Sequence, residues 1–324
     1  MRKEIVFMFS GQGSQYFQMG KELFEKHSIF RDWMIKLDQI VDNLIGESII
    51  EQIYDVNKKR DQEFYRILHT SPAIFMVEYS LAQTLIESGI KPNYVLGTSL
   101  GEFTAAAVAQ VMSVEEILEV IIRKSDYIEK HCPAGGMLAI LHASSLYFET
   151  PFLYENSELA SINYSDHFVI SGKINNLTDI QHFLNNKGII NQRLPVRYGF
   201  HSHLIDNLEV PIKQFLEGKN MHEPKIPFIS CLEGRIIEQL SKDYFWKVIR
   251  EPINIPKFLN KLEKNNAYIY LDLGTSGTMG NFVKRNINRN SQSEIFSIMS
   301  IFNQDFENLE HVKSLFVKKS FLGR

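Results

Sequence analysis

Several features that define special classes of protein are scarce in this sequence of 324 residues. There are only two cysteines, Cys132 and Cys231, which excludes a disulfide framework and a zinc site built from cysteines. The 38 acidic and 35 basic side chains nearly balance, so no broad basic field is available for a nucleic acid. The 18 glycines and 10 prolines are too few for a fibrous or disordered chain. These absences predict an ordinary globular protein in a reducing compartment.

Long apolar runs are also missing. No stretch of eighteen consecutive apolar residues occurs, which argues against a membrane-spanning helix. The apolar run near the start, residues 5–9, ends at Ser10-Gly11 and is too short for the core of a signal peptide. We therefore expect a soluble, cytoplasmic protein that has neither a membrane nor a nucleic acid as its partner.

Apolar strands alternate with amphipathic helices along much of the chain. Strands are predicted at 5–9, 94–96 and 268–273, and helices over 71–90, 102–111 and 114–130. This alternation is typical of a mostly parallel sheet in an α/β domain. The length corresponds to roughly two folding units at about 150 residues each.

The middle of the sequence has a different pattern. Strands are predicted at 137–141, 159–164, 168–172 and 189–196, with a helix over 177–186 before the last of them. This order is close to a split βαβ unit. We interpret 134–197 as a small α+β domain inserted into a larger α/β domain formed by 1–133 and 198–324.

The segment Gly97-Thr98-Ser99-Leu100-Gly101 fits the nucleophile-elbow pattern G-x-S-x-G, and it lies between a predicted strand and a predicted helix. Glycines on both sides allow a tight turn that leaves the Ser99 hydroxyl exposed above the sheet. The alternative interpretation is an ordinary turn with an inert serine.

A nucleophilic serine needs a base, and His201 and His203 both follow the predicted strand at 189–196. Spacing alone does not distinguish the two histidines. No carboxylate-rich motif accompanies the pair, so the sequence predicts no metal site.

The loop Gly11-Gln12-Gly13 also follows a predicted strand. It is not a dinucleotide fingerprint, because the third glycine of that motif would fall at Tyr16. Such a loop is suited to direct backbone N–H groups at a developing oxyanion, and the alternative is a plain tight turn.

Together these segments resemble the malonyl-CoA:acyl-carrier-protein transacylase family, which includes stand-alone acyltransferases of polyketide synthases. The resemblance covers roughly 4–285 and rests on segments that occur in the family order: 9–15, 97–102, Asn163, 169–172, 198–201 and 273–274. It implies an α/β-hydrolase-like large domain with an inserted ferredoxin-like α+β small domain. It also implies that no cofactor is required, since the phosphopantetheine arrives on the carrier protein or CoA substrate.

The resemblance implies roles for individual residues. Ser99 corresponds to the nucleophile and His201 to the general base. The family orients its histidine with a main-chain carbonyl, which the match of 244–252 places near Val248. The backbone N–H groups of Gln12 and Leu100 correspond to the oxyanion hole.

Departures from the family pattern concern the substrate. Thr98 replaces the histidine that normally precedes the nucleophile. Counting from Ser99 to Pro133 places Lys124 where malonyl-transferring members have an arginine that binds the carboxylate, whereas a one-residue gap would place Arg123 there. A lysine cannot reproduce the bidentate guanidinium fork. Phe200, directly before His201, resembles the residue that malonyl-type members have at this position. Phe200 and Asn163 complete the set of residues expected to bind the substrate.

The weakened carboxylate clamp favours a hydrolase that removes stalled neutral acyl groups from the acyl carrier protein of a polyketide synthase, with acyl-CoA as a further substrate. The alternative is a malonyl-CoA:acyl-carrier-protein S-malonyltransferase that uses Lys124 or Arg123. A third hypothesis is a non-catalytic module that docks carrier proteins, in which Ser99 would be unreactive.

Overall fold

The computed structural model describes residues 3–264, 266–300, 302 and 304–321. The larger of two sheets has the strand order β11-β10-β1-β2-β7-β8, and every pair is parallel except the hairpin of β7 and β8. Its strands are β1 (Glu4–Phe9), β2 (Tyr94–Gly97), β7 (Phe228–Ser230), β8 (Arg235–Ile237), β10 (Tyr268–Asp272) and β11 (Glu294–Ser297).

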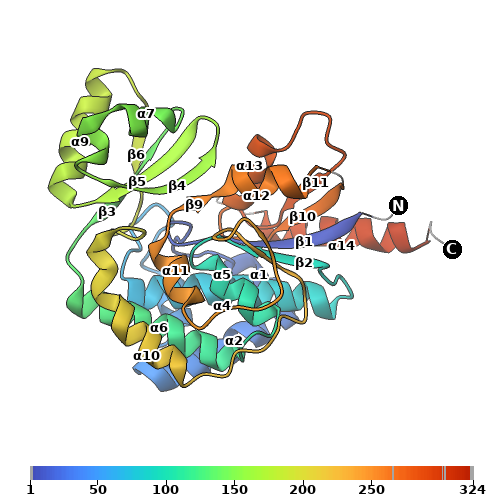
Figure 1. Cartoon of the computed structure of the whole chain (residues 1–324). Coiled ribbons are helices and arrows are strands. Elements are labelled where there is room, and N and C mark those ends of the chain that lie inside the picture. Colours follow the sequence, from blue (N-terminus) through green and yellow to red (C-terminus); the bar gives the residue numbers. More distant parts are fainter. Residues whose placement is uncertain (1–2, 265, 301, 303, 322–324) are drawn as a thin grey trace.

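Both faces of this sheet are buried, because successive side chains of each strand point to opposite faces. In β1, Phe7 and Phe9 pack into one core, whereas Val6 and Met8 pack into another. The first core is covered by α1 (Lys21–Lys26), α2 (Ser28–Ile45), α3 (Ile49–Ile53), α4 (Ile67–Glu87), α5 (Gly101–Val108), α6 (Val114–His131), α10 (Glu209–Glu217), α11 (Tyr244–Arg250) and α14 (Asp305–Phe321). The second is covered by α12 (Ile255–Leu262) and α13 (Thr278–Asn286) (Figure 1).

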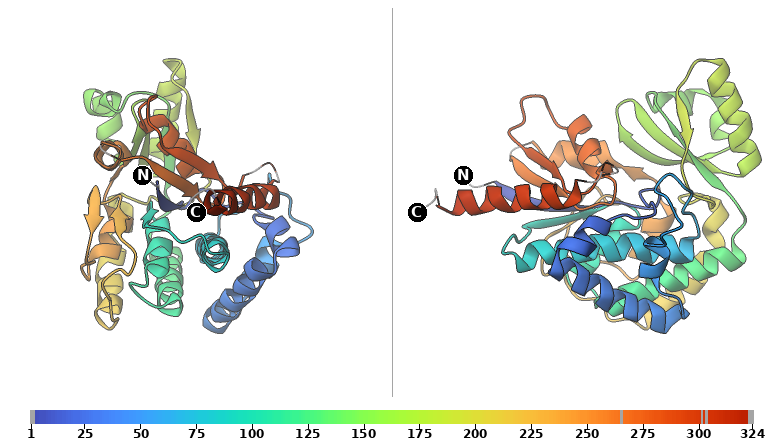
Figure 2. Two further views of the ribbon diagram at one scale, coloured as in Figure 1. Left: turned by 90° about the vertical axis from the view of Figure 1, so that its right-hand side faces the viewer. Right: turned by 180° about the vertical axis from the view of Figure 1, so that it is seen from behind.

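The continuous apolar runs of β1 and β10 therefore reflect burial on both sides, and the helices form layers on each side of the sheet. Viewed from behind, α14 runs alongside α1 at the edge of the large domain (Figure 2). None of the helices in the described segments is both long and apolar enough to cross a membrane.

The smaller sheet belongs to the inserted α+β domain and has its own core. Its strands have the order β6-β3-β5-β4, with antiparallel neighbours, and β9 (Ile253–Asn254) of the large domain adds in parallel to β4. The elements of this domain are β3 (Gly136–Ile140), α7 (Ser145–Glu149), α8 (Pro151–Tyr154), β4 (Glu158–Tyr164), β5 (His167–Gly172), α9 (Ile174–Asn186) and β6 (Asn191–Arg193). The predicted fold class, an α/β domain with an inserted ferredoxin-like domain, is confirmed.

One predicted strand is much shorter than expected. The apolar pattern at 189–196 predicted eight residues, but β6 pairs with β3 only from Asn191 to Arg193. Pro195, which has no N–H to donate, follows closely and prevents the ladder from continuing. The segment 194–202 instead crosses back to the large domain and carries His201 into the site, with the 3-10 helix η1 (His203–Leu208) directly after it.

Candidate active site

Ser99 lies in the sharp turn between β2 and α5. Its φ of 52° is in the left-handed region, which is strained for a residue with a side chain and typical of functional turns. The two flanking glycines are required by close backbone contacts. A Cβ on Gly97 would lie 2.2 Å from the Gly101 carbonyl oxygen, and one on Gly101 would lie 2.3 Å from the Phe9 carbonyl oxygen. The motif thus forms the tight strand-to-helix turn that the sequence predicted, and the role of Ser99 as a nucleophile stays a prediction.

The His201 imidazole lies beside this serine, with its Nε2 3.0 Å from the Ser99 Oγ. On the other side of the ring, Nδ1 is 2.8 Å from the carbonyl oxygen of Glu251. A carbonyl only accepts, so Nδ1 carries the proton and Nε2 is left free to accept the Ser99 hydroxyl proton. Burial lowers the pKa of His201 to about 4, which keeps the imidazole neutral at physiological pH.

The predicted carbonyl partner, Val248, is wrong. Val248 lies inside α11, where carbonyls point along the helix axis. Glu251 follows the end of that helix with an extended backbone (φ −79°, ψ 150°), so its carbonyl turns away from the axis and meets the imidazole. The motif match had selected the right segment but a position three residues too early.

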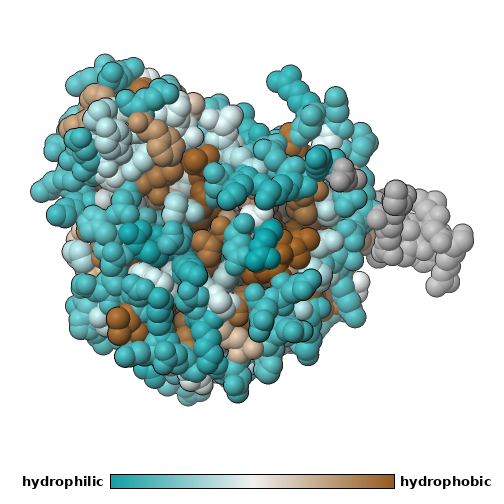
Figure 3. All heavy atoms as spheres, in the orientation of Figure 1, coloured by the Kyte–Doolittle hydropathy of each residue, from teal (hydrophilic) through white to brown (hydrophobic). Residues whose placement is uncertain are grey.

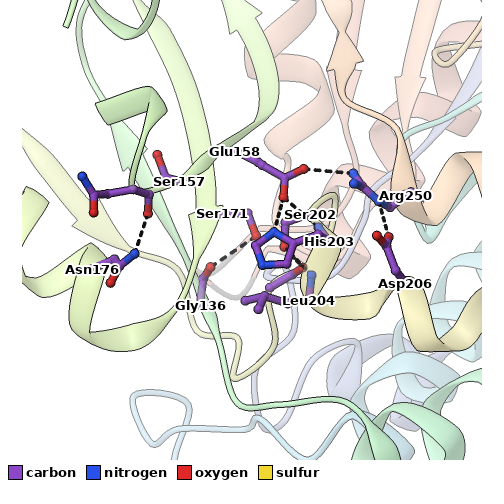
Figure 4. Close-up of polar contacts among 12 residues, drawn as sticks. Gly136, Ser157, Glu158, Ser171, Asn176, Ser202, His203, Leu204, Asp206 and Arg250 are labelled. Carbon is purple, nitrogen blue, oxygen red and sulfur yellow. Dashed lines mark hydrogen bonds and ion pairs between the residues drawn. The ribbon is translucent and has the colours of Figure 1, made fainter. Parts of the chain in front are cut away.

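The second histidine of the pair points elsewhere. His203 directs both its backbone N–H and its Nδ1 to the carboxylate of Glu158 on β4 (Figure 4). The structure therefore assigns the contact with Ser99 to His201, a choice that spacing alone had left open.

The predicted oxyanion loop lies directly against the elbow. A Cβ on Gly11 would be 2.9 Å from the Thr98 carbonyl oxygen and 3.1 Å from the Ser99 Cβ. The Gln12 side chain is held by α4, because its Nε2 donates to Thr70 Oγ1 (2.5 Å). Within the described part of the chain, the backbone N–H groups of Gln12 and Leu100 have no protein acceptor. Their role as an oxyanion hole stays a prediction, but both groups are free to fulfil it.

The buried carboxyl group of Glu78 fixes the start of this loop. The backbone N–H and the hydroxyl of Ser10 both donate to Glu78 Oε1 at 2.7 Å, and Thr104 donates to its other oxygen at 3.0 Å. Glu78 lies on α4, and Thr104 on α5, the helix that follows the nucleophile. The glycine loop at 11–13 and the helix after Ser99 therefore share one buried anchor.

Ser99 and His201 open into a cleft of about 320 Å³ between the two domains. Its lining is mostly apolar, and Figure 3 shows hydrophobic residues exposed where the small domain meets the large one. Met137, Val169 and Leu194 line it from the small domain, and Ile253, Ile255 and Phe282 from the large domain. No aspartate, glutamate, lysine or arginine of the described segments belongs to this lining.

The two candidate clamp residues lie outside this lining. The structure does not bring Arg123 to the cleft, because its exposed side chain pairs with Glu119 (3.1 Å) and covers the Phe215 ring. Lys124 points inward, is only 4% exposed and has its Nζ 5.4 Å from the centre of the Phe103 ring. Burial lowers the pKa of Lys124 to about 8. One step along a helix turns a side chain by about 100°, which separates these neighbours.

The remaining predicted substrate residues, Thr98, Phe200 and Asn163, all line the cleft. Sequence reasoning missed His167, whose Nδ1 accepts from Asn163 Nδ2 at 2.9 Å and whose ring also lines the cleft. Its position at the turn between two predicted strands, four residues after Asn163, was the available signal. Among the described residues, no group of three or more histidine, cysteine, aspartate or glutamate side chains is arranged to hold a metal ion.

The fold and the site define an enzyme of the acyltransferase class. The family model described as "Acyl transferase domain" matches residues 6–314, and the chain belongs to this family.

Two curated relatives carry names from polyketide biosynthesis. The chain is 44% identical over 313 residues to the polyketide biosynthesis acyltransferase homolog PksD of Bacillus subtilis (strain 168), and the match covers 97% of each chain. It is 42% identical to the homolog BaeD of Bacillus velezensis, again over 97% of each.

Among solved structures, the acyl transferase domain of ZmaA superposes with a TM-score of 0.83 at 26% identity, covering 98% of this chain and 75% of that one. The malonyl CoA-acyl carrier protein transacylase of Coxiella burnetii gives a TM-score of 0.80 at 20% identity, covering 97% and 98%. At 20% identity, the similarity to the Coxiella burnetii transacylase shows a shared fold alone.

Proposed function

We propose that this enzyme removes neutral acyl groups from acyl carrier protein thioesters of polyketide biosynthesis by hydrolysis, through an acyl-Ser99 intermediate. The observation that carries the proposal is the apolar cleft around Ser99, which no charged side chain of the described segments lines. The names of PksD and BaeD support the polyketide context. The carrier protein is the expected partner, with acyl-CoA as a further substrate, and the phosphopantetheine belongs to the substrate.

The chemistry follows from the arrangement of the site. His201 Nε2 removes the proton from Ser99 Oγ as that oxygen attacks the thioester carbonyl. The N–H groups of Gln12 and Leu100 stabilise the oxyanion, and Leu100 precedes α5, where the helix dipole also favours negative charge. His201 then returns the proton to the departing thiol. Water attacks the acyl-Ser99 ester with His201 again as base, which releases the carboxylic acid and regenerates the serine.

The lining of the cleft decides between acyl groups. A malonyl group carries a carboxylate, and moving that charge into an apolar cleft without a partner costs several kcal/mol. A neutral acyl chain avoids this cost and gains from burial against Val169, Leu194 and Phe282. The cleft therefore favours neutral chains over malonate.

Transfer of malonyl groups remains the second candidate, and Lys124 is the observation that favours it. The charge of Lys124 contributes to lowering the pKa of His201, so this amine lies within electrostatic reach of the site. A rearranged Lys124 would supply the cation for a malonyl carboxylate. The third hypothesis, a docking module with an unreactive serine, is disfavoured by the contact between Ser99 and His201.

Intact-protein mass spectrometry of loaded carrier proteins tests the proposal. One carrier protein is loaded with malonyl and another with acetyl or butyryl, and each is incubated with the enzyme or with the Ser99→Ala variant. An unloaded carrier protein with malonyl-CoA is run in parallel. We expect loss of the neutral acyl group to water, dependent on Ser99, with little malonyl loading. Rapid malonyl loading without hydrolysis of the neutral thioesters would refute the hydrolase and support the second candidate.

A further inference from the structure

A network of charged side chains connects the small domain to the loop that carries the catalytic histidine (Figure 4). Glu158, at the start of β4, accepts from the backbone N–H of His203 at 2.8 Å and also contacts the ring of that residue. Its other oxygen is 3.1 Å from Arg250 Nη1. Arg250 in turn donates from Nε to Asp206 of η1 at 2.5 Å. Glu158 is the member of the network that the small domain contributes.

The network holds two chain segments that position His201: the loop at 201–203 and the end of α11. His203 is two residues beyond His201, so its contact with Glu158 holds the loop that carries the ring. Arg250 directly precedes Glu251, whose carbonyl fixes Nδ1. Ile249, on the other side of Arg250, accepts the backbone N–H of His201 at 3.2 Å. The two backbone carbonyls that hold His201 therefore belong to the residues on either side of Arg250, which Glu158 contacts.

These contacts matter for geometry more than for stability. Arg250 and Glu158 are about one quarter and one third exposed, and ion pairs at such partly exposed positions contribute little to stability. Burial opposes the ionisation of Glu158, but the hydrogen bonds from His203 and the charge of Arg250 outweigh it and keep the pKa of Glu158 below its usual value. The carboxylate is thus charged and fixed by two partners that belong to the large domain.

We propose that Glu158 is a positioning residue that couples the seating of the small domain to the orientation of the catalytic imidazole. β4 also supplies Ser161 and Asn163 to the lining of the cleft, so the strand that begins with Glu158 also lines the cleft. With the small domain in this position, Glu158 holds His203 and Arg250. The Glu251 carbonyl and His201 are then aligned with Ser99.

The inference concerns the acylation of Ser99, which precedes the choice between water and thiol. It therefore does not depend on whether the enzyme is a hydrolase or a malonyltransferase. Its test uses p-nitrophenyl acetate, whose burst of p-nitrophenolate reports the acylation step alone. A wild-type enzyme that shows the burst but does not hydrolyse carrier-protein thioesters would contradict only the proposed function.

The variants are Glu158→Gln and Glu158→Ala. The amide of Glu158→Gln retains an acceptor for the His203 N–H but loses the attraction for Arg250, whereas Glu158→Ala loses both. The matched control is Glu119→Gln, because Glu119 is also a partly buried carboxylate that contacts two cations, Arg123 and Lys219, away from the cleft. The maximal acylation rate, the half-saturating concentration and the melting temperature are measured for each variant.

We expect the maximal acylation rate to fall by about tenfold in Glu158→Gln and by about 100-fold in Glu158→Ala, because misplacing a catalytic group by about 1 Å costs rates of that order. The half-saturating concentration stays within about twofold, since the lining of the cleft is unchanged. Glu119→Gln should acylate at the wild-type rate with a similar change in melting temperature. Wild-type acylation in Glu158→Gln, or an equal loss in Glu119→Gln, would overturn the inference. If Glu158→Ala does not fold, Glu158→Gln alone decides.

Discussion

Replacing Lys124 by methionine should stabilise this enzyme at neutral pH. Lys124 is buried in the large domain, where its ammonium group faces the Phe103 ring and, among the described residues, has no acidic side chain as a partner. Methionine has the same unbranched shape without the charge, so the substitution leaves the packing nearly intact. The expected gain is the cost of holding a charge in this position.

The pKa of Lys124 gives the size of that cost. Burial lowers this pKa from 10.5 to about 8, which corresponds to roughly 3 kcal/mol between the charged and neutral forms. Below pH 8 the amine is protonated in both the folded and the unfolded state, and the folded state bears the whole cost. Between pH 8 and 10.5 the folded state releases its proton first, so the stability contributed by this group rises with pH.

Chemical denaturation of wild type and Lys124→Met at pH 7 and at pH 9.5 measures this directly. The variant should be more stable at pH 7, by up to roughly 3 kcal/mol, and the difference should shrink at pH 9.5. Arg123→Met is the matched control on the same helix, because its exposed ion pair with Glu119 contributes about 0–1 kcal/mol. Hydrolysis of a neutral acyl thioester should be retained by both variants.

Two results would refute this reasoning. A variant that is less stable than wild type at pH 7, or a difference that does not change with pH, would mean that Lys124 has a favourable partner. Loss of neutral-acyl hydrolysis in Lys124→Met would mean that the amine takes part in the reaction, although it does not line the cleft.

Two further predictions concern the reaction. Because the pKa of His201 is about 4, the acylation rate of Ser99 should be constant from about pH 5.5 to 8 and should fall only as the imidazole becomes protonated near pH 4. Stopped-flow measurements of the acylation rate against pH test this, and a half-maximal rate near pH 6.5 would contradict it. Gly11→Ala should lower acylation about 100-fold, because its methyl group displaces the oxyanion loop from the elbow. Gly218→Ala, where a Cβ meets nothing closer than 3.8 Å, should acylate normally, and a wild-type rate in Gly11→Ala would exclude a role for the Gln12 N–H.

The sequence by itself determined the features that depend on local chemistry. Apolar runs bounded by glycine turns identified β1, β2 and β10 of the large sheet, because a strand buried on both faces has to be apolar throughout. The short strands β7, β8 and β11 were not predicted. Gly97 and Gly101 marked the elbow, since no other residue fits their backbone contacts. The order of strands and helix predicted over 134–197 indicated the inserted domain, and the family motifs selected His201 over His203. Thr98, Phe200 and Asn163 were correctly expected at the cleft.

Only the tertiary structure decided which groups meet across long sequence separations. The carbonyl that holds His201 comes from Glu251, because the end of α11 turns that oxygen out of the helix, and a motif match cannot resolve a shift of three residues. The pattern of α6 does not reveal that Lys124 is buried behind the site while Arg123 faces solvent. The uncharged cleft and the contacts of Glu158 arise only when the two domains pack together. Such contacts depend on the relative placement of whole domains, which no local sequence pattern specifies.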